Sequence, residues 1–275
     1  MSAEAHGKLL AMVIVLVVLG GAVKIAGFIL SGSRALYVDG LTCIASILAV
    51  VFFYRFVGEA FKPADRDHPY GHGRMLIASS MLTIVIYSFV GGVAFASIAS
   101  WGPVISLEPT GVLYAAIGLV VYSFAVLLAR RIEVAGRTLS YFTGLEILES
   151  SVSLASVTAG VYASPFYDYV GSIILLGFLV YGLVVETREI IPLISDYVPP
   201  GILDEVRREI EEEGLKVVSL RLRPCPGKGF LGDAVVRTPS YMSVDEAHKL
   251  IDLIENKVRK KYNASIVIHV EPEKN

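Results

Sequence analysis

The sequence has few charged residues for its length. Charged side chains make up 18% of the 275 residues, whereas about a quarter of the residues in an ordinary soluble domain are charged. Hydrophobic residues make up 54% of the chain. This composition excludes an ordinary soluble protein and indicates a membrane protein with a smaller soluble part.

Other absences exclude further classes of protein. The formal net charge is −2, so the chain offers no basic surface and we expect no nucleic-acid partner. The two cysteines, Cys43 in an apolar run and Cys225 in the polar tail, lie in different environments and do not indicate a disulfide framework. No H-E-x-x-H or comparable metalloenzyme motif is present. We therefore predict that the protein is not an enzyme and has no catalytic cofactor.

Apolar windows long enough to cross a bilayer, roughly 20 residues each, recur along the first two thirds of the chain. The six windows are residues 9–30, 35–57, 76–100, 111–129, 140–162 and 168–190. The first window is longer than a signal-peptide core and has no A-x-A-like cleavage site, so we expect it to remain as a span. The sequence thus predicts six transmembrane helices.

Basic residues are unevenly distributed between the loops on the two sides of the membrane. Three of them lie between the second and third windows and three between the fourth and fifth, whereas the opposite loops offer only Arg34. The six are Lys62, Arg66, Arg74, Arg130, Arg131 and Arg137. By the positive-inside rule we expect a multi-pass protein of the cell membrane with both termini in the cytoplasm.

Three carboxylates lie within the predicted spans. They are Asp39 in the second span and Glu146 and Glu149 in the fifth. Each costs on the order of 3 kcal/mol to insert, so each must be protonated, paired or bound to a cation. The only basic residue at a similar depth is Lys24, and we expect its side chain to extend to the membrane interface.

Cys43 follows Asp39 by four residues, which places both side chains on one face of a helix. Two interpretations of Asp39 stay open. It is either a metal ligand shared with the fifth span or an aspartate near the outer helix end, bonded to water or to Thr42. Cys43 taken alone would be an ordinary small buried residue, and its position beside Asp39 makes it a candidate ligand.

The loop between the second and third spans contains a second cluster. Asp65, Asp67, His68 and His72 occur within eight residues, around Pro69 and two glycines. Such turn residues would suit any solvated loop. Carboxylates and imidazoles gathered this closely can also hold a divalent metal.

The tail is charged and amphipathic, and Pro199, Pro200 and Gly201 separate it from the last span. We divide the chain into a transmembrane domain, 1–198, and a cytoplasmic domain, 199–275. Helical periodicity, alternation and a capping box at Ser243 and Glu246 predict the order helix, strand, strand, helix, strand. The expected fold is an α-helical membrane protein with six transmembrane helices and a small C-terminal α+β domain.

The Asp in the second span, the K-P-A-D sequence ending at Asp65 and the H-P-Y-G-H-G-R run ending at Arg74 resemble the cation diffusion facilitator family. That family consists of dimeric exporters of zinc and related divalent metals. The resemblance implies that Asp39 and Glu149 bind the transported ion, with Cys43 where a second Asp is usual. It leaves Glu146 as a second ligand or a proton acceptor.

The resemblance also implies sites outside the spans. It assigns Asp65, His68 and His72 to a secondary metal site, leaves Asp67 unassigned, and pairs Arg74 with Asp196. The tail is similar to the family's metallochaperone-like domain, which implies a metal site at the dimer interface. Its candidate ligands are His248, His269 and Glu271, while Val218 or Ser219 stands where relatives have a further histidine and Cys225 is a possible substitute.

We therefore predict a homodimer in the lipid bilayer that exports a divalent cation in exchange for protons by alternating access. Cys43 favours a thiophilic ion, with zinc first and cadmium next, and the carboxylates leave manganese and iron(II) open. A membrane-bound metal sensor is the competing hypothesis. It would need a working tail site, and the carboxylates within the membrane would be dispensable.

Overall fold

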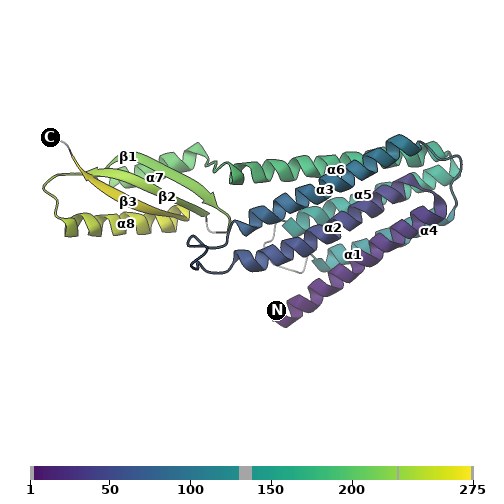
Figure 1. The fold of residues 1–275 in the computed structure, drawn as a ribbon, viewed down its shortest axis with the longest axis horizontal. Helices are drawn as coiled ribbons and strands as arrows, with labels where there is room; N and C mark the ends of the chain where they lie inside the picture. The colour runs from purple at the N-terminus through teal and green to yellow at the C-terminus, as the bar shows by residue number, and fades with distance from the viewer. Residues whose placement is uncertain (1–2, 130–137, 228, 274–275) are drawn as a thin grey trace. The chain divides into compact units, whose positions relative to one another are not determined.

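The computed structural model describes residues 3–129, 138–227 and 229–273 of the chain (Figure 1). The chain forms two compact units, Met1–Tyr54 with Met81–Thr187 and Arg55–Ser80 with Arg188–Asn275. The second loop of basic residues used above to orient the chain, Arg130, Arg131 and Arg137, lies outside the described residues.

Six long helices occupy the six predicted apolar windows. They are α1 (Ala3–Ser31), α2 (Arg34–Ala60), α3 (Met75–Trp101), α4 (Thr110–Ala129), α5 (Thr138–Tyr162) and α6 (Pro165–Ile194). Five of them, all except α5, are long and apolar enough to cross a membrane by length and composition. The helix outside that group carries Glu146 and Glu149. The helical transmembrane domain predicted from the sequence is confirmed.

The turn between α1 and α2 is fixed by a carboxylate from α6. Asp168 is fully buried; its Oδ1 accepts a hydrogen bond from the Ser33 hydroxyl at 2.5 Å and its Oδ2 accepts one from the Arg34 backbone N–H at 2.6 Å. The first N–H groups of a helix have no partner within the helix. Asp168 therefore caps α2 from a distant part of the sequence and fixes where the helix begins.

The tail forms two layers, with helices α7 (Pro200–Glu212) and α8 (Val244–Tyr262) against one three-stranded sheet. Strand β2 (Gly229–Thr238) is central, antiparallel to β1 (Lys216–Cys225) and parallel to β3 (Ala264–Pro272). The predicted order of elements is confirmed. Buried and exposed residues alternate along β3, so one sheet face packs on the helices and the other is open.

The predicted capping box is present at the start of α8. The Ser243 hydroxyl accepts a hydrogen bond from the Glu246 backbone N–H, and the Glu246 carboxylate accepts one from the Ser243 backbone N–H. This last bond lowers the pKa of Glu246. The buried residues of the tail's core all lie between Val206 and Ile268, so residues 199–275 contain a complete core of their own.

We expect residues 199–275 to fold when expressed alone, with stability that depends on the fully buried Ile254. Replacing it (Ile254→Ala) should lower the free energy of unfolding in urea by about 3 kcal/mol, since a cavity remains in the core. The neighbouring Leu253 is 46% exposed, and Leu253→Ala should cost about 0.5 kcal/mol or less. Equal losses in the two variants would show that this core does not hold the tail together.

Candidate metal centre

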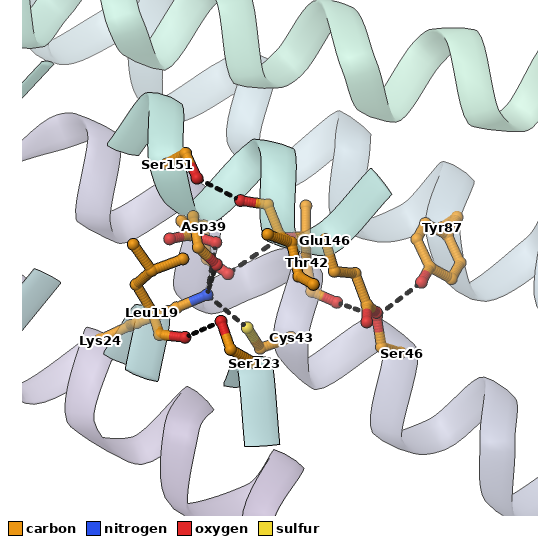
Figure 2. A network of polar contacts seen from close by, with 12 residues as sticks. Lys24, Asp39, Thr42, Cys43, Ser46, Tyr87, Leu119, Ser123, Glu146 and Ser151 are labelled. Carbon is orange, nitrogen blue, oxygen red and sulfur yellow. Dashed lines mark hydrogen bonds and ion pairs between the residues drawn. The ribbon is translucent and has the colours of Figure 1, made fainter. Parts of the chain in front are cut away.

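The four predicted ligands within the spans come from two helices that face each other. Asp39 and Cys43 lie on α2, whereas Glu146 and Glu149 lie on α5. The Ser46 hydroxyl on α2 donates a short hydrogen bond to the Glu146 carboxylate on α5, and the Lys24 ammonium bonds both Asp39 on α2 and Ser150, next to Glu149, on α5. Figure 2 shows Asp39, Cys43, Ser46 and Glu146 converging on one polar network.

All but one of these ligand side chains are fully buried. The exposed fractions are 2% for Asp39, 3% for Cys43 and 7% for Glu149, and Glu146 is partly buried. Ser153, one turn beyond Glu149, is also buried, and its hydroxyl has no hydrogen-bond partner among the described residues. Buried polar groups are normally paired. The Ser153 hydroxyl, one turn from Glu149 on α5, is therefore left without the hydrogen bond that such a group usually makes.

Lys24 on α1 lies within this network, so the expectation that its side chain extends to the membrane interface is wrong. Only 1% of the side chain is exposed. Its ammonium donates to Asp39 Oδ1 at 2.7 Å, to the Ser150 hydroxyl at 2.7 Å and to Cys43 Sγ at 3.3 Å. The physical reason is that Asp39 offers a buried counter-charge within reach, so the ammonium is better paired inside the bundle.

The carboxylate oxygens and the thiol sulfur of the four span residues do not all lie close to one point. Among the described residues, the group whose possible ligand atoms lie within 4.8 Å of one another is Asp65, His68 and His72. The Lys24 ammonium bonds Asp39 and Cys43, and Glu146 accepts from Ser46. This chemistry, two helices presenting carboxylates and one thiol, fits a divalent cation as the transported substrate.

The second cluster lies in the loop between α2 and α3, which is not helical. A turn closed by the Gly71 N–H bonding the His68 carbonyl at 2.8 Å, with Gly71 at φ 84°, brings the two imidazoles together. The ring centroids of His68 and His72 lie 4.1 Å apart. Each histidine has a ring nitrogen 3.4 Å from an Asp65 carboxylate oxygen.

Asp65 and His72 are held in states suited to ligating a metal. The backbone N–H of His68 donates to Asp65 Oδ1 at 2.7 Å, and this bond is the main cause of the lowered pKa of Asp65. His72 Nδ1 lies 3.2 Å from the Pro63 carbonyl oxygen, which can only accept. Nδ1 is therefore the ring nitrogen that donates to this carbonyl, and Nε2 is directed toward Asp65.

The predicted Arg74–Asp196 pair is present, with Arg74 Nη2 2.8 Å from Asp196 Oδ1. Both side chains are about half exposed, so the pair orients the loop and the end of α6 more than it stabilises the fold.

The three predicted tail ligands do not gather within one chain. His269 and Glu271 alternate with the buried residues of β3 and therefore lie on the open face of the sheet. His248 lies on α8, which packs on the other face, and its side chain is 75% exposed near Asp252. Cys225 is buried at the hairpin end of β1, away from the row of His269, Val235 and Ser219.

Three further residues complete the polar network in the spans: Ser46, Ser150 and Lys24 each bond a predicted ligand or its immediate partner. The two serines carried no signal in the sequence, because serines within spans are common and have no distinctive spacing. Lys24 did carry a signal, because it is the only base in the sequence at the depth of three acids. That coincidence could have indicated an internal ion pair.

Comparison with known proteins places both parts of the chain. A family model for the cation efflux transmembrane domain matches residues 9–194, and a model for the cytoplasmic domain of cation efflux proteins matches residues 198–273.

Relatives include the cation-efflux pump FieF of Shewanella oneidensis, 23% identical over 91% of this chain and 88% of its own. Metal tolerance protein 2 of Oryza sativa subsp. japonica is 22% identical over 88% of this chain and 72% of its own. The manganese efflux system protein MneP of Bacillus subtilis is 29% identical over 30% of this chain and 27% of its own.

Helices of membrane-spanning length, the buried acids that α2 and α5 share, and the match of both domains lead to one assignment. The chain belongs to the cation diffusion facilitator family of divalent metal efflux proteins.

Proposed function

We propose that the protein exports zinc, and that Asp39, Cys43, Glu149 and Glu146 bind the ion between α2 and α5. The observation that supports this proposal is a set of three carboxylates and a thiol from two helices around one buried polar network. Carboxylates in the bilayer are costly unless a cation neutralises them. A travelling metal ion provides that charge in each cycle.

The donor atoms favour zinc over a harder metal. Thiolate sulfur prefers zinc or cadmium, whereas sites for manganese or magnesium are built from oxygen ligands. MneP is named for manganese and FieF for cations in general, so the family spans several metals. Cys43 is the residue of this chain that separates the alternatives, and manganese and iron(II) remain the competing substrates.

Protons are the proposed counter-substrate. Metal ligands must be deprotonated to bind, so protons arriving from the far side of the membrane help to release the metal. Alternating access would expose the α2–α5 centre first to the cytoplasm and then to the outside. We place both termini in the cytoplasm of a cell-membrane protein. The loop with Lys62, Arg66 and Arg74 is basic and is therefore expected in the cytoplasm, and with six spans both termini lie on the same side as this loop.

We propose that the working form is a homodimer, with residues 1–198 forming the membrane part and residues 199–275 the cytoplasmic part. The open sheet face that carries His269 and Glu271 is available to a second copy of the chain. His248 lies on α8, on the helix side of the tail, so His269 and Glu271 are the predicted ligands that this face offers to a metal shared with the partner subunit.

Asp65, His68 and His72 form the proposed second metal site. Their ligand atoms already lie within 4.8 Å of one another, and the Nε2 of His72 is oriented by the Pro63 carbonyl. Zinc ligands lie about 2.0–2.2 Å from the ion, so small side-chain shifts would bring these atoms onto one zinc ion. We assign it a role in collecting metal on the cytoplasmic side.

Replacing Asp39 tests the transport site. Asp39→Asn and Glu149→Gln should each reduce zinc flux in proteoliposomes to that of protein-free vesicles, because a charged ligand is lost. Thr158→Ala is the matched control on α5, since that hydroxyl donates only to the Leu154 carbonyl of its own helix. Full flux in Asp39→Asn would remove the assignment.

A proton gradient should drive transport. Proteoliposomes with an acidic interior are expected to accumulate zinc, and an ionophore that collapses the gradient should stop the accumulation. Zinc uptake is measured with a fluorescent indicator inside the vesicles. Uptake that is the same with and without the gradient would show that protons are not exchanged.

The loop site should bind zinc independently of the transport site. In an Asp39→Asn background, calorimetric titration of the purified protein should show a binding event that His72→Ala abolishes, because the oriented Nε2 is lost. His248→Ala is the control, since that histidine lies elsewhere and is 75% exposed. Zinc binding that survives His72→Ala and falls in His248→Ala would place the site in the tail instead.

A further inference from the structure

The Lys24 ammonium bonds side chains on both α2 and α5, the two helices that carry the four proposed ligands. It contacts Asp39 and Cys43 on α2 and Ser150 on α5, and Figure 2 shows it between the Asp39 carboxylate and the Cys43 sulfur. The side chain starts on α1. A positive charge tethered to the protein therefore lies between α2 and α5, at the centre assigned to the metal.

Helix α4 provides a groove for the lysine stem. Gly118 faces it so closely that a Cβ there would lie 3.0 Å from Lys24 Cγ and 3.2 Å from Cε. The ammonium also lies 4.6 Å from the centroid of the Tyr122 ring, a favourable position for a cation. Lys24 on α1 is thus held by contacts with three other helices, α2, α4 and α5, so the packing of the bundle fixes its position.

The ammonium and a metal ion cannot share the Asp39–Cys43 position. A zinc ion bound to both residues would lie about 2.0–2.2 Å from the oxygen and about 2.3 Å from the sulfur. The Lys24 nitrogen already lies 2.7 Å and 3.3 Å from those same two atoms. A metal that enters must therefore displace the ammonium from both.

The charges make this exchange favourable only for some ions. With the three carboxylates ionised and the Cys43 thiol protonated, Asp39, Glu146 and Glu149 contribute −3 and Lys24 contributes +1, a sum of −2 that one divalent cation neutralises. Binding at Cys43 then releases the thiol proton. A monovalent ion brings no more charge than the ammonium it would replace. A divalent ion brings twice as much.

We propose that Lys24 is a tethered competitor for the transported metal: its ammonium fills the Asp39–Cys43 position between cycles, is displaced by the entering divalent ion, and returns as that ion leaves. This inference rests on the proposed function of the α2–α5 centre. Lys24 is then a specificity-determining residue, because it raises the metal concentration needed for loading, disfavours monovalent ions and helps release.

Cobalt(II) titration tests the competition, since a cobalt–thiolate charge-transfer absorption reports metal bound at Cys43. The measurement uses purified full-length protein with His68→Ala and His72→Ala, so that the loop site is silent. Replacing Lys24 with the similarly sized neutral methionine (Lys24→Met) should lower the cobalt concentration at half-saturation about tenfold or more, because a competing charge at close range is gone. Lys24→Gln, which is neutral but keeps a hydrogen-bond donor, should shift it in the same direction.

Cys43→Ser separates failure of the inference from failure of the proposed function. If the absorption is absent in the parent protein, or persists in Cys43→Ser, the metal does not bind at Cys43 and the proposed transport site is wrong. If the absorption depends on Cys43 but half-saturation in both Lys24 variants is unchanged or higher, Lys24 does not compete and this inference is overturned. Failure of both variants to fold would make Lys24 a structural residue and would overturn it as well.

Discussion

The buried ion pair between Lys24 and Asp39 is the interaction on which the helical unit depends. An unpaired charge inside a bilayer costs several kcal/mol, and both partners are almost fully buried. Asp39 is therefore stabilised by the ammonium or by a metal ion in its place, and Lys24 by a carboxylate within its reach. The pair ties α1 to α2, and the bond to Ser150 extends the tie to α5.

The rest of the unit is arranged around that pair. Glycines allow the close approach it needs, since a Cβ at Gly21 of α1 would lie 3.2 Å from the Cys43 Cβ of α2. Asp168 fixes the start of α2 by capping it from α6. The position of Asp39, one and a half turns into α2, is therefore fixed by the cap at the start of α2 and by the close approach of α1 to α2 at Cys43.

The two proposed metal centres differ in how close together their ligands lie. Asp65, His68 and His72 lie close together with their orientation fixed by backbone groups, and two of the three are exposed to solvent. Among the proposed ligands between α2 and α5, Asp39 and Cys43 are buried and both bond the Lys24 ammonium. A preformed exposed site suits capture, whereas an internal counter-charge suits a centre that must bind and release.

The sequence by itself determined the elements and the candidate ligands, because these depend on local pattern. Long apolar runs placed six helices, alternation and the Ser243–Glu246 box placed the tail's elements, four-residue spacing paired Asp39 with Cys43, and proximity in the sequence grouped Asp65, His68 and His72. Tertiary structure alone decided the direction of Lys24 and the separation of His248 from His269. Lys24 and Asp39 are 15 residues apart on different helices, so which way a flexible charged side chain turns depends on the counter-charge that packing brings within its reach.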